Sequence, residues 1–129
     1  MGRRDALDSS EENLILDLSF EFAKRIVSLY RYLQKEEEEF VLSKQLLRSG
    51  TSIGANVHEA QAAQSRKDFL SKLAIASKES RETLYWLRLL CATGYLDAEA
   101  KHVRSLLDEN RSLIKILTSI ILTIQETEK

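Results

Sequence analysis

Residues 14–33, with the sequence LILDLSFEFAKRIVSLYRYL, carry the pattern that decides the fold. Apolar side chains recur every three or four residues along this stretch, at Ile15, Leu18, Phe22, Ile26, Leu29 and Leu33. This spacing matches the 3.6-residue turn of an α-helix and places the six side chains on one face. The stretch therefore predicts an amphipathic helix, which we expect at about residues 11–35.

Three further stretches show the same helical spacing, and local signals mark where they begin and end. Ser43 and Ser65 occupy positions typical of N-terminal caps. Gly94 is placed to end a helix in a left-handed conformation, and Asp97 is placed to cap the next one. We expect these helices at about residues 43–64, 66–93 and 98–125, after a flexible N-terminal segment at residues 1–10.

The connections between these helices are short, and short connections make neighbouring helices run antiparallel. The sequence therefore predicts an all-α, up-down-up-down four-helix bundle over residues 11–126. The absence of proline and the presence of only four glycines in 129 residues argue against a β-sandwich or barrel, whose many turns use both.

Composition narrows the classes of protein further. With 43% hydrophobic and 30% charged residues, the chain suits one globular domain. No apolar run approaches the roughly 18 residues of a membrane helix, so no membrane partner is expected. The single cysteine, Cys91, forms no internal disulfide, and we interpret it as a small core residue in a cytoplasmic protein.

The last helix and the second helix each have a feature that the folding of a single chain does not require. The last helix is apolar around more than one face, at Leu113, Ile114, Ile116, Leu117, Ile120, Ile121, Leu122 and Ile124, which predicts self-association. Gly50 and Gly54 lie one turn apart inside the second helix, where glycine is unfavourable. We favour close approach of another backbone as the reason, with a functional kink as the alternative.

A strip of small and polar side chains flanks the core face of the second helix. It includes Ser52, Asn56 and Glu59. We expect these residues, with Ile116 and Leu122, to form the oligomer interface. An ordinary boundary between core and surface is an equal alternative for the strip.

Catalytic patterns are poor, so we expect no enzyme, no cofactor and no metal site. A di-metal bundle needs Glu-x-x-His pairs, and neither His58 nor His102 has a glutamate three residues earlier. Glu79 and Glu82 are three residues apart, but Lys78 and Arg81 stand beside them. A surface charge network is the favoured interpretation of these four residues. The alternative is metal binding, which would make the protein a metal-dependent bundle enzyme.

Charge is uneven along the chain although the net charge is −1. Residues 41–94 carry eight basic and four acidic residues, a net charge of +4. The candidate nucleic-acid-binding residues are therefore Lys44, Arg48, Arg66, Lys67, Lys72 and Arg88. Antiparallel packing divides them between the two ends of a bundle, and no aromatic residue is interleaved with this set. Ordinary surface charge is the alternative.

The run from Leu46 to Ala60, LLRSGTSIGANVHEA, resembles the family of bacterial four-helix-bundle proteins also called 23S rRNA intervening-sequence proteins. SRKDF at 65–69, KLAIA at 72–76, ETLYWL at 82–87 and GYL at 94–96 extend the resemblance over about residues 18–122. It implies a compact antiparallel bundle that assembles into a ring-like homopentamer, with no established catalytic residues.

These observations lead to two functional hypotheses. The first is a non-enzymatic homo-oligomer that binds RNA or another nucleic acid, suggested by the basic middle segment and by the family's place within ribosomal RNA genes. The second is a protein–protein adaptor without nucleic-acid contact, suggested by the low net charge and the excess apolar surface of the last helix.

Overall fold

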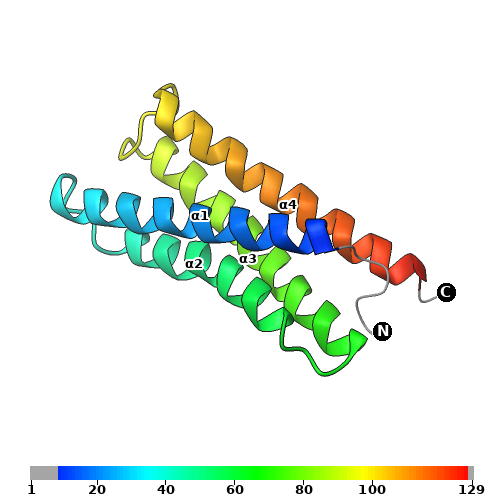
Figure 1. Cartoon of the computed structure of the whole chain (residues 1–129). Helices are drawn as coiled ribbons and strands as arrows, with labels where there is room; N and C mark the ends of the chain where they lie inside the picture. The colour runs from blue at the N-terminus through cyan, green and yellow to red at the C-terminus, as the bar shows by residue number, and fades with distance from the viewer. Residues whose placement is uncertain (1–8, 128–129) are drawn as a thin grey trace.

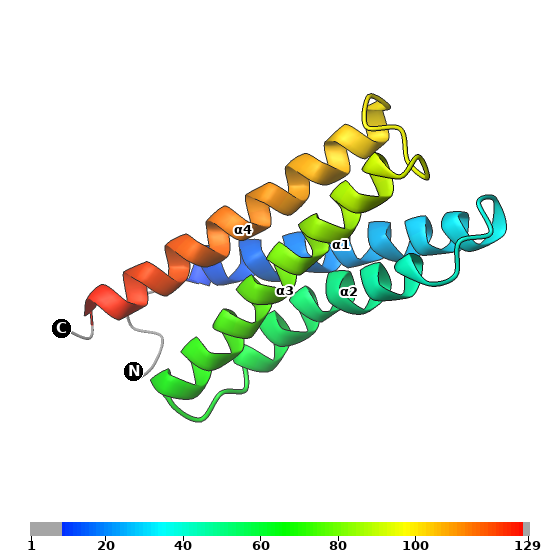
Figure 2. The same ribbon diagram turned by 180° about the vertical axis from the view of Figure 1, so that it is seen from behind.

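The computed structural model describes residues 9–127, which fold into four helices joined by short loops (Figure 1). The helices are α1 (Ser9–Lys35), α2 (Leu42–Ala60), α3 (Arg66–Ala92) and α4 (Lys101–Thr127). No strand occurs within residues 9–127, so the predicted all-α class is confirmed. The loops at 36–41 and 93–100 lie at one end of the molecule, and the loop at 61–65 lies at the other (Figures 1 and 2).

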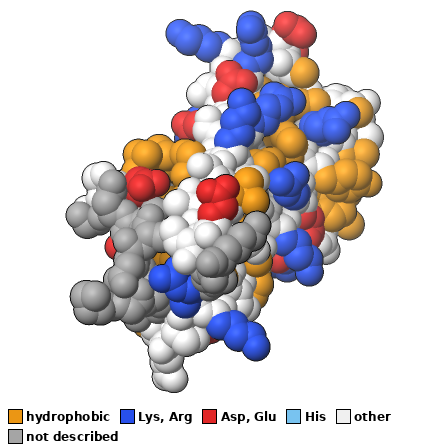
Figure 3. Space-filling view, turned by 90° about the vertical axis from the view of Figure 1, so that its right-hand side faces the viewer, with side chains coloured by type: hydrophobic (Ala, Val, Ile, Leu, Met, Phe, Trp, Pro, Cys, Tyr) orange, Lys and Arg blue, Asp and Glu red, His pale blue; other side chains and the backbone are white. Residues whose placement is uncertain are grey.

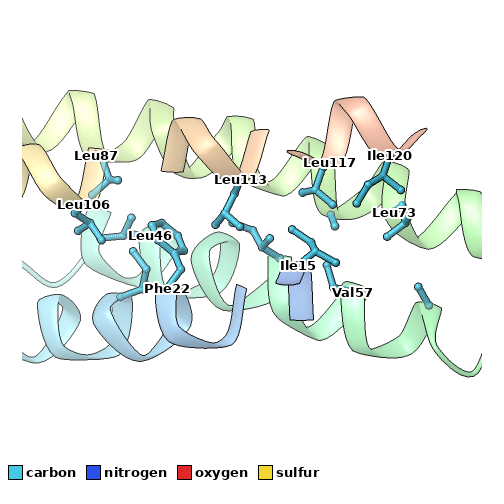
Figure 4. Packing of buried hydrophobic residues seen from close by; sticks show 14 of the residues in the cluster. Ile15, Phe22, Leu46, Val57, Leu73, Leu87, Leu106, Leu113, Leu117 and Ile120 are labelled. Atoms are coloured by element: carbon cyan, nitrogen blue, oxygen red, sulfur yellow. The ribbon is translucent and has the colours of Figure 1, made fainter. Parts of the chain in front are cut away.

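One hydrophobic core joins the four helices. α1 and α3 each pack against both α2 and α4. The predicted apolar stripes supply the core: Phe22 of α1, Leu46 of α2 and Leu87 of α3 are buried there, with Leu113 and Leu117 of α4 (Figure 4). α4 packs more extensively on α3 than on α1, so the seam between α1 and α4 is the more open one.

Several helix ends differ from the sequence prediction. α1 begins at Ser9, so Ser9 and Ser10 belong to the helix and not to a flexible segment at 1–10; residues 1–8 of that prediction lie outside the described residues. α2 ends at Ala60 and not at residue 64. The reason is a tightening of the backbone, because Ala63 N donates to Ala60 O at 3.1 Å, a bond spanning three residues.

α4 also begins later than predicted, at Lys101 and not at residue 98. Asp97 holds a separate turn before the helix. Its Oδ1 accepts the backbone N–H of Glu99 at 2.9 Å, and its carbonyl accepts that of Ala100 at 3.0 Å. The side chain of Asp97 therefore completes a local turn instead of capping α4 directly.

The start of α2 depends on Glu39 and not on Ser43, the predicted cap. The buried carboxylate of Glu39 accepts the backbone N–H groups of Val41, Leu42 and Ser43 at 3.1, 2.9 and 2.6 Å. Ser43 lies inside the helix, where its Oγ donates to the carbonyl of Glu39 at 2.8 Å. Glu39 thus satisfies backbone donors that the first helical turn leaves without partners.

Two other predicted caps are confirmed. Ser65 has an extended backbone, and its Oγ accepts the N–H of Asp68 at 3.0 Å. Gly94 has a φ of 89°, and the following Tyr95 N donates back to Leu90 O at 3.0 Å. These two residues therefore set both ends of α3.

Close approach of α1 explains the two glycines of α2. A Cβ atom at Gly50 would lie 2.8 Å from Cγ2 of Ile26, and one at Gly54 would lie 3.2 Å from the backbone oxygen of Ser19. Both distances are shorter than ordinary carbon contacts. Close approach of another backbone is therefore confirmed at Gly54, whereas the close neighbour at Gly50 is the side chain of Ile26.

Candidate nucleic-acid interface

The seam between α2 and α3 balances the charge of two predicted binding residues. The guanidinium of Arg48 donates to Glu79 at 3.1 Å and also to Glu82. The ammonium of Lys72 lies 3.2 Å from the carboxylate of Glu59. Each of these cations already has an acidic partner on the neighbouring helix, so neither is a free phosphate ligand.

This pairing adds Arg48 of α2 to the surface charge network expected for α3. Glu79 and Glu82 form ion pairs with Arg48 across the seam, and the positive charge of Lys78 also acts on Glu82. The reason is position on the helix, since Glu79 and Glu82 lie on the side of α3 that meets α2. Lys78 and Arg81 are left exposed on the remaining surface.

The other predicted binding residues are divided between the two ends of the molecule. Lys44 and Arg88 are exposed near the end that holds the loops at 36–41 and 93–100. Arg66 and Lys67 begin α3 at the opposite end, where Arg66 Nη1 donates to Thr127 Oγ1 at 3.1 Å. The predicted set therefore does not form one continuous surface.

Six basic side chains, of which only Arg88 belongs to the predicted set, share one face of α3 and α4. The three on α3 are spaced three and seven residues apart, and the three on α4 are spaced seven and four apart. Such spacings keep side chains on one side of a helix. We call this surface the basic face; its exposed members are Lys78, Arg81, Arg88, Arg104, Arg111 and Lys115.

Contacts between the two helices bring the α3 and α4 halves of the basic face together. Arg81 Nη2 donates to Thr118 Oγ1 at 3.3 Å. A shallow hollow between the helices is lined by Arg81, Ile114, Lys115, Thr118, Ser119, Leu122, Thr123 and Glu126. Figure 3 shows Lys and Arg side chains gathered in the upper part of the view, on the side where α4 lies in Figure 1.

Few carboxylates balance the basic face. Arg111 lies 3.9 Å from Asp108 on its own helix, at the limit of an ion pair. Among the described residues, the other five members form no ion pair, and Glu126 lies at the rim of the hollow. The face therefore presents a local excess of positive charge on a chain whose net charge is −1.

The five residues predicted for the oligomer interface lie on different faces. On α2, Asn56 Nδ2 donates to Ser52 O at 2.9 Å, and Glu59 faces Lys72 of α3. The remaining two belong to α4. Ile116 lines the seam with α1, whereas Leu122 lines the hollow with α3.

Two exposed apolar side chains of α1 lie along the open seam between α1 and α4. Leu14 is 50% exposed and Leu18 is 37% exposed, and both line hollows that also contain Ile116. We call Leu14, Leu18 and Ile116 the apolar seam. Apolar side chains gathered in this way mark candidate surfaces for association.

Neither a metal-binding cluster nor a membrane-spanning helix occurs in the part of the chain that the structure describes. Within residues 9–127 no group of three or more His, Cys, Asp or Glu side chains is arranged to hold a metal ion. Across the same described range, none of the helices has the length and apolar character needed to cross a membrane.

The four-helix fold places the chain among small all-α proteins, and similarity of sequence and structure identifies the family. The chain belongs to the 23S rRNA-intervening sequence protein family, whose model matches residues 11–119. It is 53% identical to a crystal structure of a protein with unknown function from the S23 ribosomal protein family of Bacteroides thetaiotaomicron VPI-5482. That match has a TM-score of 0.82 and covers 86% of this chain and 97% of the other. No curated protein matches the chain.

Proposed function

We propose that this chain is a non-enzymatic RNA-binding protein that holds RNA phosphates on the basic face. The observation that supports this is the grouping of six exposed Lys and Arg side chains on α3 and α4 with one weak ion pair among them. Membership in the 23S rRNA-intervening sequence protein family supports RNA as the nucleic acid.

The chemistry of the basic face suits phosphates of the RNA backbone. Arginine and lysine make charge-assisted hydrogen bonds to phosphate oxygens, and these contacts supply affinity without reading sequence. At physiological salt, charges separated by more than about 8 Å are largely screened, so a local cluster determines binding more than net charge does. A net charge of −1 is therefore compatible with this function.

The proposal also includes self-association of an antiparallel bundle through the apolar seam. Leu14 and Leu18 leave apolar surface uncovered on α1, and Ile116 faces the same groove from α4. The ring-like homopentamer implied by the family resemblance would repeat the basic face around one assembly. Repetition raises the effective concentration of phosphate contacts along a single RNA.

The binding proposal is tested by two matched double variants of the full chain. Arg81→Ala/Lys115→Ala removes two charges from the basic face, and Lys44→Ala/Lys67→Ala removes two exposed charges elsewhere. Binding to a labelled fragment of large-subunit ribosomal RNA is followed by fluorescence anisotropy in about 50 mM salt, where phosphate contacts are strong.

We expect the variant of the basic face to bind at least about tenfold more weakly, while the control stays within about twofold of the parent chain. Equal losses in both variants would contradict the basic face as the site. If the parent chain binds no RNA, the adaptor hypothesis becomes the leading one. The apolar seam would then be the surface to test for a protein partner.

A further inference from the structure

Tyr85 stands within the basic face of α3. Lys78, Arg81, Tyr85 and Arg88 follow one another at spacings of three, four and three residues, so they form one ridge along the helix. Tyr85 is 57% exposed. The ridge thus alternates an open aromatic ring with guanidinium groups one helical turn before it and one turn after it.

Contacts on one side restrain the ring of Tyr85. Its centroid lies 5.0 Å from that of Trp86, with the ring planes at 73°. Trp86 is fixed in turn, because its Nε1 donates to a carboxylate oxygen of Glu82 at 3.0 Å. Tyr85 is therefore held in place while more than half of it remains open to a ligand.

The negative charge of Glu82, the carboxylate of α3 nearest to Tyr85, is offset by an ion pair and does not repel a phosphate bound at this ridge. Glu82 lies one turn before Tyr85, but Arg48 of α2 donates to it across the seam. The ion pair compensates the negative charge of Glu82. Arg81 and Arg88, which flank Tyr85, form no ion pair among the described residues.

We propose that Tyr85 is a stacking platform for an unpaired base, and that Arg81 and Arg88 bind the phosphates on either side of it. This inference rests on the proposed RNA-binding function and adds the class of ligand, which is single-stranded RNA. A base in a duplex is stacked between its neighbours and leaves no free face for Tyr85. An unpaired base offers that face whatever its identity, so the site selects single strands without selecting sequence.

The test compares two probes and three variants of the full chain. The probes are a labelled single-stranded oligouridylate and an RNA duplex of equal length, measured by anisotropy at one salt concentration. Tyr85→Ala removes the ring, and Tyr85→Phe keeps it. Tyr32→Ala is the matched control, because Tyr32 is a second exposed tyrosine that lies on α1, outside the basic face.

We expect Tyr85→Ala to weaken binding of the single strand by about 5- to 140-fold, the range for losing one stacked base. Its affinity for the duplex, and the affinity of Tyr85→Phe for the single strand, should stay within about twofold of the parent chain. Tyr32→Ala should leave both affinities unchanged. Circular dichroism of each variant confirms that the helices are intact.

The parent chain provides a second readout because Trp86 is its single tryptophan. A base stacked on Tyr85 changes the surroundings of the adjacent indole, so the single strand should alter Trp86 emission while the duplex should not. Undiminished single-strand binding by Tyr85→Ala, or equal losses for both probes, would overturn the stacking site. If the charge variants still lose binding, the proposed function stands. Failure of the parent chain to bind either probe would overturn both.

Discussion

Glu39 is the last residue of a run of four glutamates, and the fold gives it a role different from that of its neighbours. Its side chain is buried, which disfavours the charged form, but three backbone N–H groups at Leu42, Ser43 and Val41 bind that form. The bonds outweigh the burial and hold the pKa of Glu39 below its usual range. Glu39 is therefore a buried capping residue, although it belongs to a run of acidic residues that also contains the exposed Glu36 and Glu38.

Replacement of Glu39 by glutamine should lower the free energy of unfolding by about 1–2 kcal/mol at pH 7, the usual cost of losing a cap. A lowered pKa in the folded state means that the stabilisation is complete above the ordinary value of 4.5 and disappears as the pH falls through the folded-state value. The parent and variant stabilities should therefore converge in acid.

Urea denaturation at pH 7 and pH 3 checks this expectation. Glu36→Gln is the matched control, because Glu36 belongs to the same run and is exposed. A stability difference between parent and Glu39→Gln that stays constant down to pH 3 would contradict the capping role.

Arg48 is a basic residue whose role, like that of Glu39, depends on its contacts in the fold. It was a candidate for phosphate binding because of its charge, yet its two partners are Glu79 and Glu82. Hydrogen bonds from Trp86 and Arg48 hold the pKa of Glu82 below its usual range, and the bond to Glu82 raises the pKa of Arg48. The contact therefore favours the charged forms of both Arg48 and Glu82. Arg48 therefore joins α2 to α3.

At the scale of the helix, α1 and α2 approach closely because Gly50 has no side chain. A methyl group there would meet both Cγ atoms of Ile26, at 2.8 and 2.9 Å. Ile26 is fully buried and branched at Cβ, so it has little freedom to move away. The contact makes alanine unfavourable at a helical position where alanine is otherwise the better residue.

We expect Gly50→Ala to lower the free energy of unfolding by about 1–3 kcal/mol, the cost of overpacking a core. In the background of Ile26→Ala, which removes the obstructing atoms, the same change should cost nothing or stabilise the chain. Thermal and urea unfolding of the four proteins in this cycle measure the coupling. Equal effects of Gly50→Ala in both backgrounds would refute the proposed contact.

The sequence alone correctly predicted those features of the fold that depend on the spacing of nearby residues. The stripe of α1, the cap at Ser65 and the left-handed Gly94 each follow from neighbours within a few residues. The cap at Glu39 was missed because its identification requires knowing that the side chain is buried. The late start of α4 was missed because an aspartate accepts backbone N–H groups in the same way in a turn as at the start of a helix. The sequence around Asp97 does not distinguish the two.

The basic face was missed for a geometric reason. A sum of charge along the chain averages Arg104, Arg111 and Lys115 with every acidic residue of the same segment, including Glu109, which pairs with Arg25 of α1. Their spacing of seven and four residues was the available signal. It became meaningful only when the fold set α4 beside Arg81 and Arg88 of α3.

At the scale of the whole molecule, the apolar seam predicts that single chains do not remain apart. We expect light scattering to give a mass that is a multiple of the 14.8 kDa chain. Leu14→Glu places a charge on half-exposed apolar surface and should shift the mass toward one chain while the helices remain intact.

Val41→Glu is the control for that experiment, because Val41 is an exposed apolar residue in the loop at 36–41, away from the seam. It should leave the mass unchanged. A parent chain with a mass of 14.8 kDa would rule out self-association, and the RNA-binding proposal would then apply to single chains.

The central claim is that the α3/α4 surface binds RNA phosphates, and salt dependence tests it most directly. Each phosphate contact with a single strand contributes about −0.7 to the slope of log affinity against log salt concentration. Titrations between about 50 and 200 mM salt should give a slope near −4 if all six members of the basic face take part.

The same titration of Arg81→Ala/Lys115→Ala should give a slope smaller in magnitude by about 1.4, because each of the two lost phosphate contacts contributes about 0.7. Lys44→Ala/Lys67→Ala should retain the slope of the parent chain. Binding with the predicted slope, reduced only in the variant of the basic face, would establish the account. An identical slope in all three proteins, or no binding at low salt, would contradict it.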